Sequence, residues 1–141
     1  MDVDSGDGPV VNLLWTGGWD STFRLLQLIL DTRATIQPVY VIDTARRSSL
    51  IEIRTMDRIK RKIVKRFPHA EGRILPHWFF SIHDIAEDAT ITESYLRLAR
   101  RWHLGSQYDW LPRLAKQHAL GALEMSVVAD SRPRGGIVQC L

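Results

Sequence analysis

Short apolar runs alternate along this chain with longer segments in which apolar residues recur every three or four positions. The short runs predict strands over residues 10–15, 36–42, 73–80 and 123–129, the third interrupted by Pro76. The periodic segments predict helices over residues 20–30, 48–67, 90–105 and 111–120. Strands and helices in alternation predict an α/β fold with a mostly parallel sheet, whose strand carboxyl ends share one edge.

Local signals set the expected ends of these helices. Pro68 is expected to end the second helix, and Thr90 with Glu93 forms a predicted capping box for the third. Pro112 is expected in the first turn of the fourth. The first helix is apolar almost all round, from Phe23 to Leu30, which predicts that it is buried against the sheet.

A glycine-containing loop separates the first predicted strand from the first helix. Its sequence is Thr16-Gly17-Gly18-Trp19-Asp20-Ser21-Thr22. Two glycines allow consecutive amides to converge on one anion, and the unpaired amides and dipole of the following helix favour negative charge. The hydroxyls of Thr16, Ser21 and Thr22 add donors. We therefore expect the loop to bind phosphate, with an ordinary turn capped by Asp20 as the alternative.

This loop resembles the Ser-Gly-Gly-x-Asp-Ser signature of the PP-loop ATP pyrophosphatases, with Thr16 in place of the first serine. Among them, the chain is most similar to the 7-cyano-7-deazaguanine synthases of queuosine biosynthesis. The resemblance implies a Rossmann-like fold in three layers, similar to the adenine-nucleotide α-hydrolases, with its C-terminal part incomplete here. Members adenylate a carboxylate or carbonyl oxygen with ATP, releasing pyrophosphate and then AMP.

Further expectations follow from the resemblance. ATP would bind through residues 16–22, with Asp20 and Ser21 as catalytic residues and Mg²⁺ held by Asp20 and Asp43. Asp43 follows the second predicted strand. A role in the turn after that strand is as well supported by the sequence as a role beside the nucleotide. Arg47 lies in a segment that resembles Gly-Gln-Arg-His-x-x-Glu-Leu of the deazaguanine synthases, although its spacing to Glu52 is one residue longer. The resemblance makes Arg47 a candidate to contact phosphate or a substrate carboxylate.

A second candidate for the substrate pocket lies before the last predicted helix. Gln107 and Tyr108 follow Gly105-Ser106, about where related enzymes complete the pocket, and a plain loop with a packed tyrosine is the alternative. His77 and His83 flank an apolar segment that is unlike a metal site. Cys140 is the only cysteine, so the four-cysteine zinc site typical of the deazaguanine synthases is not expected.

Composition limits the class of protein. The chain has 141 residues, of which 45% are hydrophobic, and lacks a long apolar run or a signal-peptide pattern. We expect a flexible segment over residues 1–9, one cytoplasmic domain over 10–130 and an irregular tail over 131–141, with no membrane partner. A partly apolar sheet edge favours a homodimer or a partner subunit.

Positive charge gathers in one predicted helix. Its cationic residues are Arg58, Lys60, Arg61, Lys62, Lys65 and Arg66. Such a segment is more often a solvated helix face than a nucleic-acid surface, so nucleic-acid binding is the less favoured reading. Two functions remain: an ATP-dependent ligase or amidase acting on a small carboxylate such as a deazapurine, or a non-catalytic nucleotide-binding or assembly subunit.

Overall fold

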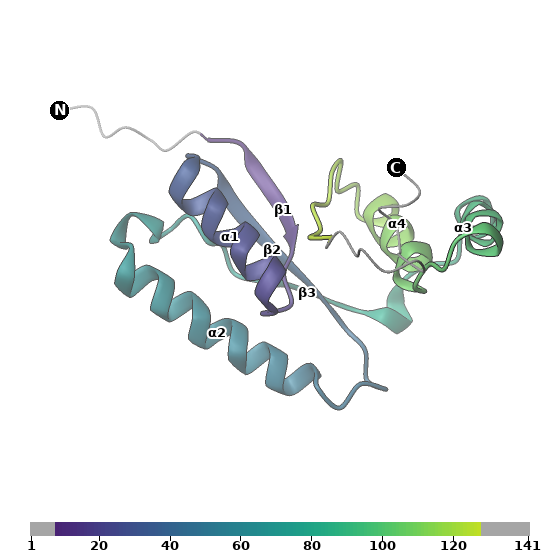
Figure 1. The fold of residues 1–141 in the computed structure, drawn as a ribbon, viewed down its shortest axis with the longest axis horizontal. Coiled ribbons are helices and arrows are strands. Elements are labelled where there is room, and N and C mark those ends of the chain that lie inside the picture. Colours follow the sequence, from purple (N-terminus) through teal and green to yellow (C-terminus); the bar gives the residue numbers. More distant parts are fainter. Residues whose placement is uncertain (1–7, 128–141) are drawn as a thin grey trace. The chain divides into compact units, whose positions relative to one another are not determined.

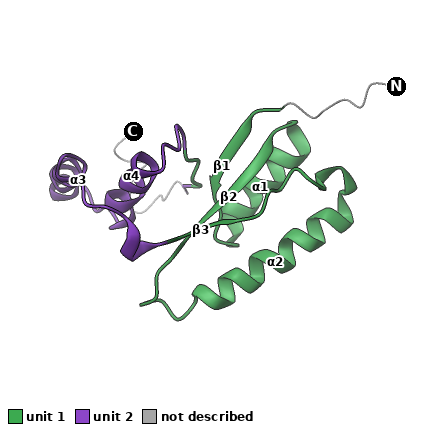
Figure 2. Cartoon of the chain, turned by 180° about the vertical axis from the view of Figure 1, so that it is seen from behind, with its two compact units in different colours: residues 1–80, 123–126 green, residues 81–122, 127–141 purple. Residues whose placement is uncertain are grey.

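A computed structural model describes residues 8–127 of the chain. The described chain divides into two compact units, one built from residues up to 80 together with 123–126, the other from residues 81–122 and 127 (Figure 2). The sequence predicts one domain over residues 10–130, and this division into units does not test that prediction. Residues 1–7 of the predicted flexible segment at 1–9, and the predicted tail at 131–141, lie outside the described residues.

The first unit contains a parallel sheet in the strand order β1-β2-β3 (Figure 1). Its strands are β1 (Val10–Leu14), β2 (Thr35–Ile42) and β3 (Trp78–Ser81). β1 and β2 pair in register from Val10 opposite Thr35 to Leu14 opposite Val39. Ile74 forms a parallel bridge to Ile36 on the far side of β2. The predicted α/β class with parallel strands is confirmed.

Glu124 lies beside the other edge of β1, far from it in sequence. It forms a parallel bridge with Leu13, and the amide of Leu14 donates to its carbonyl oxygen at 2.8 Å. The predicted strand at 123–129 is therefore reduced, within its described part, to this bridge. Across the unit, the order of parallel partners is the Glu124 segment, β1, β2 and the Ile74 segment.

Pro76 interrupts the third strand, as its missing amide requires. The bridge at Ile74 precedes it, and β3 begins only at Trp78. The side chain of Gln37 in β2, which is 4% exposed, donates to the Pro76 carbonyl at 2.7 Å. A side-chain hydrogen bond thus ties the interrupted segment to β2.

Two helices pack with the sheet in one hydrophobic core. They are α1 (Trp19–Asp31) and α2 (Ser49–Arg66). The helices contribute Leu25 and Met56 among other residues, and the strands contribute Leu13, Trp15 and Tyr40. The register places those strand residues on one face of the sheet. Both helices therefore cover the same face.

The predicted helix ends are confirmed in this unit, but not the complete burial of α1. α1 begins next to Asp20 and α2 ends just before Pro68, which opens the short 3₁₀ helix η1 (Pro68–Ala70). Phe23 and Leu30 of α1 are 57% and 50% exposed. Only one side of α1 faces the core, so the apolar residues on its other side remain exposed. The apolar composition of the helix therefore predicted more burial than the structure shows.

Arg73 fastens the C-terminal end of α1. Its guanidinium donates to the carbonyl oxygens of Leu28, Ile29, Thr32 and Ala34 at 2.8–3.1 Å. The last carbonyls of a helix have no intrahelical donor, and a cation also complements the negative end of its dipole. One side chain from the third strand segment thus completes the first helix.

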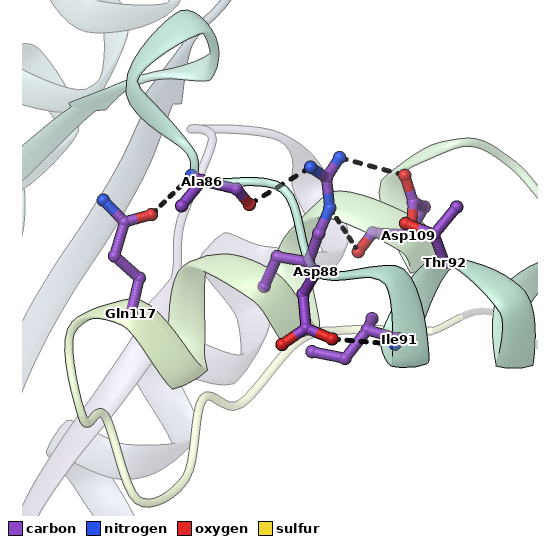
Figure 3. A network of polar contacts seen from close by, with 7 residues as sticks. Ala86, Asp88, Ile91, Thr92, Asp109 and Gln117 are labelled. Atoms are coloured by element: carbon purple, nitrogen blue, oxygen red, sulfur yellow. Dashed lines mark hydrogen bonds and ion pairs between the residues drawn. The ribbon is translucent and has the colours of Figure 1, made fainter.

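The second unit contains η2 (Ile82–Asp84), α3 (Ala89–Arg101) and α4 (Gln107–Gln117). Figure 3 shows a polar network in it. Arg113 of α4 donates to both the Asp109 carboxylate and the Ala86 carbonyl, and Gln117 accepts from the Ala86 amide. Thr92 of α3 donates to Asp109 at 2.7 Å. One side of α4 therefore holds the segment before α3 as well as α3 itself.

Two expected helix starts in this unit are wrong. Asp88 caps α3 by accepting from the Ile91 amide, so Thr90 lies inside the first turn instead of forming a capping box (Figure 3). α4 begins at Gln107, which places Pro112 inside the helix and not in its first turn. In both cases residues before the apolar pattern already adopt helical structure. None of the helices in the described part of the chain has the length and apolar character to cross a bilayer.

Candidate functional site

The loop between β1 and α1 needs glycine at one of its two glycine positions. Gly17 has φ +73°, in the left-handed region, whereas Gly18 is extended with φ −72° and ψ 167°. A Cβ on Gly17 would lie 3.0 Å from Met56 Cγ, while one on Gly18 would meet only the Thr16 hydroxyl, at 3.4 Å. The backbone at Gly17 thus turns against α2, and Gly18 is left in an open position.

Side chains of the loop hold its shape. The Ser21 hydroxyl lies 3.4 Å from the Thr16 amide and donates to the Gly18 carbonyl at the same distance. Buried Trp15, at the end of β1, donates through Nε1 to the Thr22 hydroxyl at 3.0 Å. Ser21 is only 8% exposed. These hydroxyls therefore organise the loop in addition to any role as ligand donors.

The loop leaves several backbone donors unused. Gly18 is the N-cap of α1 and makes no side-chain capping bond. Among the described residues, no hydrogen bond is made by the amides of Gly17, Gly18, Trp19, Asp20 and Ser21. Amides at the start of a helix, next to the positive end of its dipole, bind anions such as phosphate. The geometry is suited to an anion at residues 17–21.

The segment around Glu124 lies against the same end of α1. Arg24 forms a two-point ion pair with Glu124, at 2.9 and 3.3 Å, and the Ser126 hydroxyl donates to the Asp20 carbonyl at 3.3 Å. The Glu124 carboxylate raises the pKa of Arg24, mainly through this hydrogen bond. Sequence reasoning missed these residues, since no local pattern links position 24 to position 124.

Strand order reverses beside the loop. From β1 the chain proceeds to β2 on one side, and it returns at Glu124 on the other. In open α/β sheets, ligands collect at the carboxyl edge where strand order reverses in this way. The loop follows directly from the carboxyl end of β1, so its unused amides lie at that point of the sheet.

An aromatic stack borders the end of β1. The His77 ring lies between those of Trp15 and Phe79, with centroids 5.2 and 5.4 Å away and planes within 18°. Burial, followed by the Lys60 charge, lowers the pKa of His77 to about 4, against an opposing effect of Asp57. Its Nε2 has no hydrogen-bond partner among the described residues. His77 is therefore neutral at pH 7 and acts as an aromatic packing residue.

Polar side chains also meet where β2 ends. The Tyr40 hydroxyl donates to Glu52 of α2 at 2.5 Å, and Arg46 pairs with the same carboxylate at 2.8 Å. Burial and this hydrogen bond raise the pKa of Tyr40. Arg47, the candidate contact for phosphate or a substrate carboxylate, is exposed next to this pair.

Asp43 has the role of a turn residue. Its carboxylate accepts from the Ala45 amide at 2.9 Å, and its carbonyl accepts from the Arg46 amide and the Ser49 hydroxyl. These contacts match the turn alternative for Asp43. Asp20 is exposed in the first turn of α1. No group of three or more His, Cys, Asp or Glu side chains that could hold a metal ion occurs within residues 8–127.

Gln107 and Tyr108 belong to the second unit. Both lie in the first turn of α4, not in a loop as predicted, and Gln107 is exposed. The loop, Asp43 and Arg47 belong to the first unit. The site described here therefore consists of first-unit residues only.

Comparison of the chain with protein-family models, with curated proteins and with solved structures found no match. The function proposed below rests on the residues and geometry of the loop.

Proposed function

We propose that the loop at residues 16–22 binds the pyrophosphate part of ATP, and that the protein is an adenylating ligase or amidase of the PP-loop type. The supporting observation is the set of unused amides at residues 17–21, at the carboxyl end of β1 where strand order reverses. In this proposal the sheet is the core of a three-layer, Rossmann-like fold similar to the adenine-nucleotide α-hydrolases.

The chemistry of the loop fits a nucleotide phosphate. Because the loop holds no lysine, backbone amides would carry most of the interaction with the phosphate charge. The Asp20 carboxylate makes no hydrogen bond or ion pair with another described residue, so it is the better candidate for Mg²⁺. Asp43 has one oxygen engaged by the Ala45 amide and would be the second, weaker candidate.

Each loop residue has a proposed role. The amides of Gly17 to Ser21 bind phosphate oxygens, and the hydroxyls of Thr16 and Ser21 keep the loop in shape. Asp20 would hold Mg²⁺, which would neutralise phosphate charge. ATP supplies the activating group when bound, by adenylating a carboxylate and releasing pyrophosphate. Arg47, Gln107 and Tyr108 remain candidates for the site of a small carboxylate substrate such as a deazapurine.

A nucleotide-binding subunit without catalysis is the second candidate function. It is favoured by the engagement of Asp43 in a turn and by the absence of a three-ligand metal cluster within the described residues. Both candidates require ATP binding, and only the first requires turnover.

The test is calorimetric titration of the protein with ATP and Mg²⁺. We expect saturable binding that is weakened at least tenfold in Asp20→Ala. Asp31→Ala is the matched control, because it removes the same charge from an exposed position at the other end of α1. Circular dichroism would establish that both variants are folded. Unaltered binding in Asp20→Ala, or no binding by the folded wild type, would contradict the ATP site.

Turnover then separates the two candidates. The ligase is expected to release AMP and pyrophosphate only when a carboxylate acceptor such as a deazapurine carboxylate is supplied with ammonia. It is also expected to catalyse carboxylate-dependent exchange of labelled pyrophosphate into ATP, with loss of exchange in Asp20→Ala. ATP binding without exchange across a panel of carboxylates would favour the non-catalytic subunit.

A further inference from the structure

The outer face of α2 carries a stripe of positive charge, which we call the α2 cationic stripe. It consists of Arg54, Arg58, Arg61, Lys62 and Lys65, all exposed. At 100° per residue these positions fall within a sector of about 100° around the helix. Met56 and Ile63, which are buried in the core, lie on the opposite side. The helix therefore separates an apolar face from a cationic one.

Most charges of the stripe are not neutralised by neighbours. Asp57 pairs with Arg61, four residues along the helix. Arg54, Arg58, Lys62 and Lys65 make no ion pair with any described residue. Lys60 does not belong to the stripe, because it turns away and donates to the Leu75 carbonyl at 3.2 Å, where burial lowers its pKa. The stripe has a net positive charge.

A shallow, open depression lies between these side chains. Its volume is about 490 Å³, and its lining consists of the stripe together with Asp57. Favourable interaction with the helix dipole explains cations in the last turn, where Lys65 and Arg66 lie. It does not explain Arg54 in the first half of the helix or Arg58 near its middle. A helix face that is only exposed to solvent would be expected to carry both acidic and basic residues. Among the six lining residues, however, only one is a carboxylate.

We propose that the α2 cationic stripe binds the phosphodiester backbone of a double-stranded nucleic acid. From Arg54 to Lys65 the helix rises about 16 Å. One duplex strand carries a phosphate about every 3.4 Å along its axis, so about five phosphates span that length. The five cations of the stripe therefore face a length of one strand that carries about five phosphates. The stripe has no aromatic residue on which a base could stack, so it binds the backbone without reading sequence.

The proposal is independent of the ATP site, because it involves no residue of the loop. The test is fluorescence anisotropy of a labelled short RNA duplex, and of the DNA duplex of the same sequence, titrated with full-length protein over a range of salt concentrations. Affinity is expected to fall steeply with salt. The triple variant Arg58→Ala, Lys62→Ala, Lys65→Ala is expected to lose about tenfold or more in affinity and to lower the salt slope by about 3.

A matched variant controls for overall charge. Arg97→Ala, Arg100→Ala, Arg101→Ala removes the same charge from exposed positions of α3 and is expected to keep most of the affinity. Equal loss in both triple variants would overturn the proposal, since net charge alone would then explain binding. So would binding to phosphatidylserine vesicles without binding to either duplex. Retained ATP binding in the α2 variant would show that the two sites are separate.

Discussion

Gly17 lies against Met56 so closely that a Cβ on the glycine would come within 3.0 Å of Met56 Cγ. The glycine also has a left-handed φ of +73°. Gly17→Ala is therefore expected to destabilise the protein by about 1–2 kcal/mol, because alanine is strained in this conformation and the methionine must move. Urea unfolding followed by circular dichroism measures the change.

Gly18→Ala is the companion variant. Gly18 has an ordinary extended backbone, and the added methyl group would meet only the Thr16 hydroxyl, at 3.4 Å. Its free energy of unfolding is expected to change by less than about 0.5 kcal/mol. Equal destabilisation by the two substitutions would contradict this description of the loop.

Arg73→Met is expected to destabilise the first unit by about 2 kcal/mol, because it leaves carbonyl groups at the end of α1 without their charged donor. Arg73→Lys is expected to recover only part of the loss, since one ammonium group cannot reproduce the planar fork. Lys65→Met removes an exposed charge from the same unit and serves as the control. Unfolding in urea compares the three variants, and full recovery by lysine would contradict the capping role.

The free energy of unfolding is expected to decrease as the pH is lowered, because His77 titrates. Its pKa is lowered to about 4 in the folded protein, against about 6.5 when unfolded, so between these values the unfolded chain binds more protons. The stabilising effect is complete above about pH 6.5 and is lost as the pH falls toward 4. We expect a loss on the order of 1–2 kcal/mol, reduced from the full shift because the ring is partly exposed.

His77→Phe isolates this effect. Phenylalanine keeps a ring between Trp15 and Phe79 but does not titrate. The difference in unfolding free energy between wild type and variant, measured by urea titration at several pH values, is expected to change through this window and to be constant above it. A difference independent of pH would contradict the neutral, half-buried state of the imidazole.

Asp88→Ala is expected to lower the melting temperature more than Thr90→Ala. The Asp88 carboxylate accepts from the Ile91 amide (Figure 3) and also pairs with Lys116. The hydrogen bond from Lys116 is the largest cause that lowers the pKa of Asp88. The stabilisation is present at neutral pH and is lost as the pH falls through the lowered pKa. Differential scanning fluorimetry at neutral and acidic pH tests both points. A larger decrease in melting temperature for Thr90→Ala would contradict the Asp88 cap and would support the predicted capping box.

Local pattern was sufficient to predict the strand, loop and helix at the start of the chain. The apolar run before Thr16, the glycines and the periodic helix occur within a short stretch, and the loop forms where expected. The end of α2 before Pro68 was predictable for the same reason. The exposure of Phe23 could not be predicted, because composition does not indicate which side of α1 packs against the sheet.

Long-range partners could not be read from the sequence. Arg24 with Glu124, Arg73 with the end of α1, and Gln37 with Pro76 each depend on how the strands are ordered. The ion pair between Arg46 and Glu52 likewise depends on how the chain leaves β2. The caps of unit 2 also depend on tertiary contact, since Asp88 is held by Lys116 of α4 as well as by its own helix.

The bridge between Leu13 and Glu124 has a consequence for biogenesis. The first unit receives its last segment only after residues 81–122 of the second unit have been synthesised, so it cannot be completed early during translation. Until then the outer edge of β1 has unpaired backbone groups, which is the kind of edge that recruits other chains into aggregates. A fragment ending at residue 80 would keep that edge permanently, whereas a chain reaching residue 126 closes it. Contacts of such long sequence separation also make folding slow, which prolongs the exposure.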